Sequence, residues 1–320
     1  MVVSDQANIL YYLEECKKFY KCNDFLEAAV NAYWCVKYCE QGEPYGMSRE
    51  ELSRSESEAR AIMRSSSRKF KSSKLSKTTF VYGTICPKLL WLYKNEYNLR
   101  RVSKETQKKF DEGHIIGTLA QRLFPDGIDA SDVDSERIID MTRFYLPFNL
   151  KQQLWLNRTE EYYPDHTVYE AAFVYNDVFA AIDILTKGTN GHIGYEVKCS
   201  KSITETLLKD CALQYYVISK NCKLEDFFLV YVNEQYLDSI QVSLGEMNES
   251  NVDMERLFIK ESVLSRILPL QEEIRSKIEF CKSVLSGGEP SVKIGSQCTY
   301  PYECMFTQYC KNADRDFDIW

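Results

Sequence analysis

Two acidic residues and a lysine lie on either side of the turn-forming segment Gly188-Thr189-Asn190-Gly191. Asp183 precedes the segment, and Glu196 and Lys198 follow it. If residues 178–187 and 192–199 pair as antiparallel strands around a symmetric loop, position 183 faces position 196. Directly opposed side chains have Cβ atoms about 4.5 to 5.5 Å apart, and Lys198 shares the face of Glu196 because strand side chains alternate. The spacing therefore predicts two carboxylates and an ammonium group in one small area.

Two carboxylates this close repel each other unless a cation lies between them. Divalent cations such as magnesium bind carboxylate oxygens, retain water molecules and activate them for hydrolysis. The apolar residues Ile182, Ile184, Ile193 and Val197 predict that the opposite face of the strands is buried. The pattern is therefore a signature of metal-dependent phosphodiester chemistry, and a solvated strand face with scattered charges is the alternative.

The surrounding segments alternate between helical and strand periodicity. We expect helices at 76–85, from Pro87, at 106–124, at 203–219 and between 252 and 286, and strands at 167–175, 178–187, 192–199, 227–232 and 239–243. A helix, three antiparallel strands, a helix and a further strand in this order are typical of the restriction-endonuclease-like fold. The expected fold class is α/β (α+β), with a mixed sheet flanked by helices.

An N-terminal helical module is expected at residues 1–70, ahead of a catalytic domain at 71–320. Residues 5–41 have the periodicity of a helical hairpin, and Ser48 and Glu51 form a capping box for a third helix that ends near residue 66. The module offers a surface for a protein partner. Its cysteines, Cys16, Cys22, Cys35 and Cys39, are expected to be core residues, with zinc binding as the alternative.

The residues around Asp183 resemble the RecB-type branch of the PD-(D/E)xK nuclease superfamily, in which an acidic residue precedes a Glu-x-Lys segment. The resemblance implies that Asp183 and Glu196 are metal ligands and Lys198 is the catalytic lysine. It also implies that His114 and the main-chain carbonyl of Val197 are further metal ligands.

The resemblance extends to the helix after the strands, but less completely. Gln214 matches the first residue of the Q-x-x-x-Y motif of that branch, and its implied role is catalytic. Ile218 replaces the motif tyrosine, so Tyr215 or Tyr216 would have to substitute for it. Glu170, on the preceding strand, is a secondary acidic candidate.

Four cysteines form a second candidate site. Cys298, Cys304 and Cys310 are evenly spaced near the C-terminus, and Cys86 lies far upstream in Cys86-Pro87-Lys88. This set is similar to that of the iron-sulfur nucleases, namely the CRISPR-associated RecB-like exonucleases and the nuclease domain of the helicase-nuclease AddB. The resemblance implies a 4Fe-4S cluster that joins the two ends of the domain, although the first gap of the trio is longer than usual. A zinc site and free thiols remain alternatives.

Charge is distributed unevenly along the chain. The net charge is −7, yet residues 60–109 contain 14 Lys or Arg and only Glu96 and Glu105 as acids. A clustered excess of cations is expected of a surface that contacts nucleic-acid phosphates, and a solvated basic linker is the alternative. No segment resembles a membrane span or a signal peptide, so we expect a cytoplasmic protein with reduced thiols and no membrane association.

These features together predict a DNA nuclease that uses Mg2+ or Mn2+, with exonuclease action favoured, in DNA repair, recombination or defence against phage and mobile elements. A catalytically inactive nucleic-acid-binding or scaffold protein on the same fold is the alternative. A subunit to which a partner delivers DNA is a third possibility.

Overall fold

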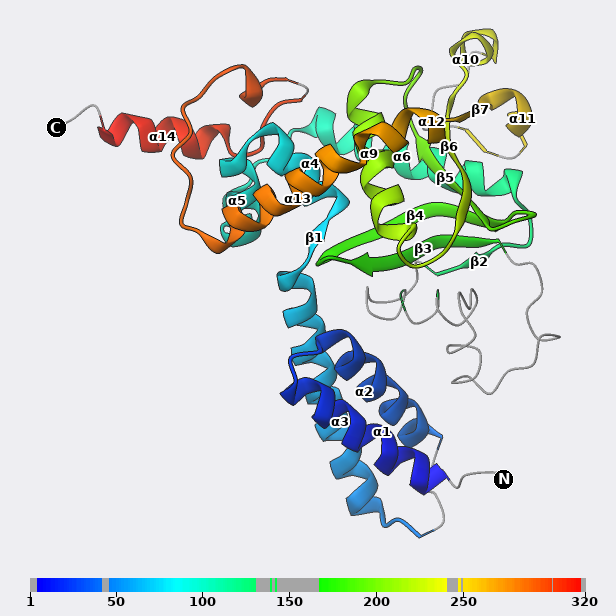
Figure 1. Cartoon of the computed structure of the whole chain (residues 1–320), viewed down its shortest axis with the longest axis vertical. Coiled ribbons are helices and arrows are strands. Elements are labelled where there is room, and N and C mark those ends of the chain that lie inside the picture. The colour runs from blue at the N-terminus through cyan, green and yellow to red at the C-terminus, as the bar shows by residue number, and fades with distance from the viewer. Residues whose placement is uncertain are drawn as a thin grey trace. The chain divides into compact units, whose positions relative to one another are not determined.

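The computed structural model describes residues 5–41, 46–130, 139, 142, 167–240, 247, 248, 250–300 and 302–317. The chain divides into two compact units, and the first boundary lies between Lys74 and Leu75. One unit contains the first three helices, and the other contains the sheet and the helices around it (Figure 1). In the part of the chain that the structure describes, no helix is long and apolar enough to cross a membrane.

The first unit is built from α1 (Asp5–Lys21), α2 (Phe25–Glu40) and α3 (Arg49–Ser73). Asp24 caps α2 by accepting a hydrogen bond from the Glu27 amide at 3.3 Å. The predicted capping box opens α3, where the Glu51 amide donates to Ser48 Oγ and the Ser48 amide donates to Glu51 Oε2. The helical hairpin and the start of the third helix are confirmed, but α3 continues beyond the predicted end at residue 66.

The cysteines of this unit are mostly core residues, as predicted. Cys16, Cys35 and Cys39 are buried among apolar side chains of the three helices, and burial raises the pKa of Cys16 to about 11. Their contacts are with apolar side chains, which is the environment of a core residue, and a thiol buried in this way stays protonated when no metal is bound. Cys22 is exposed near the end of α1, so the expectation of a core position was wrong for that residue.

The second unit is organised around a mixed sheet that has seven strands in the described residues, in the order β2-β3-β4-β5-β6-β7, with the short β1 paired to β4. The strands are β1 (Leu75–Ser76), β2 (Ile128–Asp129), β3 (Val168–Tyr175), β4 (Val178–Lys187), β5 (His192–Lys198), β6 (Leu224–Val232) and β7 (Phe258–Ser262). The β3–β4, β4–β5 and β6–β7 pairs are antiparallel, and the β5–β6 pair is parallel. The predicted α/β class, with helices flanking a mixed sheet, is confirmed at this level.

The central hairpins have the predicted register. β4 and β5 pair Ile184 with Tyr195 and Lys187 with His192, which is the pairing of a symmetric loop. The Gly188 amide donates to the Gly191 carbonyl at 2.8 Å and closes that loop. Asn176 and Asp177 connect β3 to β4 with φ of 51° and 59°, as the favoured two-residue hairpin turn requires.

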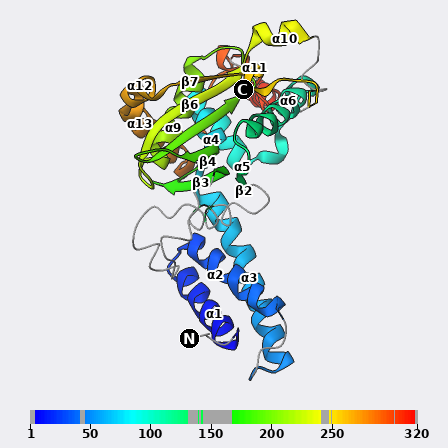
Figure 2. The same cartoon turned by 90° about the vertical axis from the view of Figure 1, so that its right-hand side faces the viewer.

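Helices cover the two faces of the sheet. The main helices are α4 (Lys77–Ile85), α5 (Pro87–Asn95), α6 (Lys104–Ala120), α9 (Glu205–Ile218) and α13 (Gln271–Ser286). Val197 of β5 packs in one apolar cluster with Ile116 and Leu119 of α6. Because side chains alternate along β5, its neighbours Glu196 and Lys198 point to the face covered by α9. Figure 2 shows α6 and α9 on opposite sides of the strands.

The region after β6 differs from the prediction. Residues 234–240 form helix α10 (Glu234–Ile240). The strand expected at 239–243 was therefore wrong for residues 239 and 240. Residues 241–243 lie outside the described residues. Asn233 Oδ1 accepts a hydrogen bond from the Tyr236 amide and starts this helix. The helices expected between 252 and 286 are α11 (Met254–Leu257), α12 (Leu264–Ile267) and α13, and β7 separates the first two. Pairing of β7 covers a sheet edge that β6 would otherwise expose.

Candidate active site

A buried group of charged side chains lies where β4 and β5 stop pairing. The last paired residues of these strands are Ile184 and Tyr195, and the next positions are Asp183 and Glu196. Asp183 Oδ2 accepts a hydrogen bond from the Val197 amide at 2.5 Å, so its side chain binds the neighbouring strand beside Glu196. The predicted proximity of the two acids therefore holds, and Glu196 is fully buried.

Two lysines neutralise Glu196. Lys198 Nζ contacts Glu196 Oε1 and also lies 2.8 Å from Asp210 Oδ2 on α9. Lys77 Nζ, from the first residue of α4, lies 2.7 Å from the same Glu196 Oε1. Sequence reasoning gave no role to Lys77 or Asp210, yet both belong to the group around Glu196.

Several polar atoms in this group have no hydrogen-bond partner in the described part of the chain. They are Glu196 Oε2, Asp210 Oδ1 and both polar atoms of the Gln214 side chain amide. Gln214 is fully buried and lies four residues after Asp210 on α9, which places the two side chains on one helix face. A buried polar atom without a partner costs about 1 to 3 kcal/mol, so this group is incomplete as a purely structural feature.

Burial and charge separate the protonation behaviour of the two acids. Burial, reinforced by Glu196, raises the pKa of Asp183 to about 8. Burial also opposes the charge of Glu196, but Lys198 and Lys77 outweigh it and hold its pKa at about 2. Glu196 is therefore the permanent anion of the pair, and Asp183 carries the proton when no further cation is present.

Glu170 of β3 completes a row of three acids across the sheet. It lies between the pairs Tyr169–Ile184 and Ala171–Ile182 of the β3–β4 register, which places it opposite Asp183. Burial raises the pKa of its carboxyl to about 7. Its φ is 56°, a left-handed conformation that is unusual for a non-glycine residue and concentrates at functional sites.

His114 does not join this group in the structure. It is an exposed residue of α6, which buries Ile116, Leu119 and Ala120 against the sheet instead. Throughout the described ranges, no group of three or more His, Cys, Asp or Glu side chains has the arrangement of a metal site. The predicted histidine ligand and the Val197 carbonyl ligand thus remain predictions.

The oxygen donors nevertheless suit a hard divalent cation. Glu170, Asp183, Glu196 and Asp210 supply four carboxyl groups, whereas Lys77 and Lys198 supply two positive charges within interaction range. Together with these two ammonium groups, one divalent cation would balance the four carboxylates if all of them were ionised. Glu196 Oε2 is a buried oxygen without a partner among the described residues.

Tyr216, one of the two possible substitutes for the motif tyrosine, contacts the far end of the β3–β4 hairpin. Its ring lies 5.5 Å from that of Tyr175, and its hydroxyl accepts a hydrogen bond from Asn176. It therefore serves packing at the turn. Tyr215 is half-buried on α9.

The four cysteines of the second candidate site line one small cavity. Cys86 lies between α4 and α5, Cys298 ends a short 3-10 helix, and Cys310 lies in α14 (Thr307–Phe317). The Cys304 amide donates to the Cys298 carbonyl at 2.9 Å and holds this part of the loop together. Burial, with the nearby cysteines adding to it, raises the pKa of Cys310 to about 11. The cavity brings together the four thiols that the sequence indicated.

Glu289 holds the two cysteine-bearing segments side by side. Its Oε1 atom lies 2.9 Å from Lys88 Nζ of α5, and its Oε2 atom accepts a hydrogen bond from the Tyr309 hydroxyl at 2.9 Å. Lys88 is nearly buried, so this pair is less screened by water than a surface pair. The contact fixes α14 beside α5 without any contribution from a metal.

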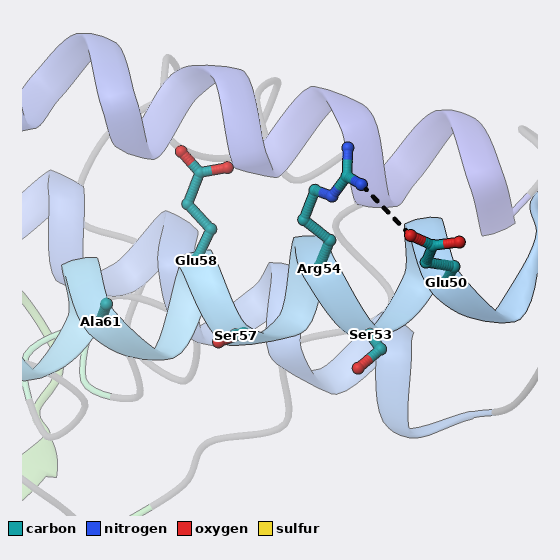
Figure 3. A pocket seen from close by; sticks show the side chains of 6 residues that line it. All are labelled: Glu50, Ser53, Arg54, Ser57, Glu58 and Ala61. Atoms are coloured by element: carbon teal, nitrogen blue, oxygen red, sulfur yellow. Dashed lines mark ion pairs between the residues drawn. The ribbon is translucent and has the colours of Figure 1, made fainter.

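A hollow on α3 of the first unit has a different character. Glu50, Ser53, Arg54, Ser57, Glu58 and Ala61 line it (Figure 3). Arg54 and Glu50 form an exposed ion pair of 3.5 Å, and Glu58 pairs with Lys17 at 2.8 Å. These solvated ion pairs have none of the buried charge that marks the group around Glu196.

No family model matches the chain, and no curated protein matches it. Among solved structures, the crystal structure of SSO0001 is similar, with 12% identity and a TM-score of 0.33. The match covers 75% of this chain and 86% of that chain. A likeness of this size carries no argument about fold or activity.

The protonation of Asp183 predicts how stability depends on pH in the presence of EDTA. Burial raises the pKa of Asp183 to about 8 in the folded protein, whereas the pKa of an unfolded Asp is about 4. The protonated Asp183 therefore contributes its full share of stability below about pH 4, and this contribution is lost as the pH rises towards about 8. Asp183→Asn should therefore lose less stability than the wild type between about pH 5 and 8, by at least about 1 kcal/mol. Urea unfolding at the two pH values measures the difference.

Asp238→Asn is the matched control because Asp238 is an exposed residue of α10. That variant should follow the wild type at both pH values. An Asp183→Asn protein with the pH dependence of the wild type would contradict the assignment of the buried proton.

Proposed function

We propose that the chain is a divalent-metal-dependent DNA nuclease with a restriction-endonuclease-like catalytic domain, acting as an exonuclease in DNA repair, recombination or defence. The observation that carries the proposal is the fully buried Glu196, held by Lys77 and Lys198 and adjoined by Asp183. Buried ionised side chains are expensive, and replacing such groups by apolar residues is often neutral or stabilising. Their retention here favours a chemical role.

Each residue of the group would have a separate role in phosphodiester hydrolysis. Asp183 and Glu196 would hold Mg2+ or Mn2+, with Glu170 as a further acidic group. Such an ion supplies an activated water and polarises the phosphate when bound. Lys198, whose ammonium Asp210 also holds at 2.8 Å, would orient the attacking water or the phosphate. Gln214 has buried amide atoms without a partner in the described part of the chain, and they could join the same network.

The remaining ligands of the proposal come from the resemblance to RecB-type nucleases. His114 would have to turn from its exposed position on α6 towards the acids, and the Val197 carbonyl would complete the set. The Val197 amide already binds Asp183, so this residue lies next to the proposed ligands.

The start of α6 supports a nucleic-acid substrate. Arg101, Lys104 and Lys108 are exposed there, and Arg100 stacks 3.7 Å from the centre of the Tyr97 ring. Exposed cations beside an aromatic ring can contact phosphates and stack with bases. The wider basic segment is less uniform, because Lys77 and Lys88 form ion pairs with acids inside the second unit.

A 4Fe-4S cluster bound by Cys86, Cys298, Cys304 and Cys310 is part of the proposal. The four residues line one cavity, and iron would bind them as thiolates in place of the protonated thiols. The cluster would join the start of α5 to the C-terminal helix.

One observation favours the alternative of a catalytically inactive nucleic-acid-binding or scaffold protein. Glu196 Oε1 already has two ammonium partners, so this carboxylate is neutralised without a metal ion. Divalent metal affinity separates the two functions, because a scaffold does not need a cation at this position.

Substitution of the central residues tests the nuclease directly. Asp183→Asn should bind Mn2+ much more weakly and should lower cleavage of labelled single- and double-stranded DNA by at least about a hundredfold. Lys198→Ala should lower cleavage by a similar factor while Mn2+ binding is retained or tightened, because the lysine is not a ligand and its charge opposes that of the cation. Thermal shift with and without Mn2+, beside the cleavage assay, measures both effects.

Lys201→Ala is the control for Lys198→Ala. Lys201 lies three residues further on and forms an exposed ion pair with Glu234. Its loss should leave cleavage and metal binding unchanged. Undiminished DNA cleavage by Asp183→Asn would end the assignment of the active site.

Charge reversal at the start of α6 tests the DNA surface. Replacing Arg100, Arg101, Lys104 and Lys108 by Glu should weaken DNA binding and flatten its dependence on salt. Each lost phosphate contact lowers the slope of log affinity against log salt by about one. Fluorescence anisotropy across a salt series measures this slope, and an unchanged slope would show that the segment does not contact DNA.

Anaerobic purification tests the iron-sulfur cluster. The protein should be brown and absorb broadly near about 400 nm. Cys86→Ser or Cys310→Ser should lose iron and destabilise the second unit. Cys222→Ser replaces a buried cysteine outside the cavity and should retain iron. A colourless protein with stoichiometric zinc would favour the zinc alternative, and one with neither metal would favour free thiols.

A further inference from the structure

Lys77 has a fixed backbone and a long side chain that reaches into the buried group. Leu75 pairs with Val178 of β4, and the Leu75 amide donates to the Asp177 carbonyl at 2.9 Å. Ser76 then caps α4 by accepting a hydrogen bond from the Thr79 amide. The residue that follows is Lys77, so its main chain is anchored on β4, the strand that carries Asp183.

The two lysines on Glu196 are held differently. Lys198 contacts Glu196 and Asp210, whereas Lys77 has Glu196 as its one ion-pair partner among the described residues. The side chain of Lys77 is 28% exposed, although the carboxylate that it binds has no exposure. Part of the Lys77 side chain is therefore in contact with solvent while its ammonium binds the buried acid, so release from Glu196 would move this charge towards water.

Lys77 and a divalent cation cannot both bind Glu196 at full strength. Both carry positive charge and would lie within a few Å of each other at this carboxylate, and a divalent ion repels the ammonium twice as strongly as a monovalent ion would. A metal that binds Glu196 must therefore weaken the ion pair between Lys77 and that carboxylate, or be excluded by it. The released ammonium is a strong donor for a phosphate oxygen.

We propose that Lys77 is a resident counter-ion that couples metal binding to substrate binding. Without DNA, its ammonium holds Glu196 and keeps metal affinity low. A DNA phosphate draws the ammonium away, and Glu196 then becomes available to the divalent cation. This inference rests on the proposed nuclease function. By thermodynamic linkage, DNA must tighten metal binding by the same factor by which the metal tightens DNA binding.

The test is the Mn2+ affinity of the full chain, measured by isothermal titration calorimetry with and without a cleavage-resistant phosphorothioate DNA. In the wild type, the DNA should tighten Mn2+ binding about tenfold or more. Lys77→Met should bind Mn2+ about tenfold more tightly than the wild type without DNA, and DNA should then change that affinity by less than about twofold. Lys77→Arg keeps the charge and should retain most of the coupling.

Lys209→Met is the matched control. Lys209 lies beside Asp210, its side chain is 32% exposed, and its ion pairs with Glu205 and Glu273 lie outside the acidic group. This variant loses the same charge at similar exposure and should behave like the wild type. Lys77→Gln is a second uncharged variant, to be used if thermal unfolding shows that Lys77→Met does not fold.

The outcomes separate this inference from the proposed function. If the wild type cuts DNA, yet a folded Lys77→Met or Lys77→Gln protein has wild-type Mn2+ affinity and wild-type coupling, the role of Lys77 is refuted and the nuclease stands. If Lys209→Met shifts Mn2+ affinity as much as Lys77→Met, the effect is one of net charge and the inference is also refuted. If the wild type neither binds Mn2+ nor cuts DNA, the proposed function fails and the inference fails with it.

Discussion

The second unit depends on the burial of one carboxylate. Glu196 lies at the end of a central strand with no exposed surface, and both of its oxygens are removed from water. An isolated buried carboxylate would cost several kcal/mol, so its two ammonium partners are a condition for this packing. They come from α4 and β5, and α9 supplies Asp210 to hold one of them. The charge of one residue therefore constrains where a strand and two helices meet.

The parts of this site that the sequence predicted are those set by local geometry. The register of β4 and β5 follows from a short loop closed between Gly188 and Gly191, so the proximity of Asp183 and Glu196 could be worked out from spacing alone. Side-chain alternation then placed Lys198 on the same face. The β3–β4 hairpin was predictable for the same reason, because Asn176 and Asp177 readily adopt positive φ.

The parts that the sequence did not reveal depend on contacts between distant segments. Lys77 is 119 positions from Glu196, and it begins a helix whose cap gives no sign of a charged partner. β7 has a short and mixed pattern, with Phe258 buried and Ile259 exposed, and it becomes a strand because the edge of β6 is available to pair. The spacing of Asp210 and Gln214 on one face of α9 was the one local signal that could have indicated a larger polar group.

The cysteine cavity and the acidic group differ in how their surroundings are stabilised. Around the cavity, Glu289 already joins α5 to α14 through Lys88 and Tyr309, so this packing has a source of stability of its own. Around Glu196, by contrast, several features lower the free energy of unfolding. Glu170 has a left-handed backbone, and Asp183 must take up a proton. Polar atoms of three side chains also lack hydrogen-bond partners among the described residues. Each of these features makes the folded state less stable than an apolar core of the same size would be, so stability does not account for them. Their concentration at the point where β4 and β5 separate is therefore the observation on which the proposed metal and substrate site rests.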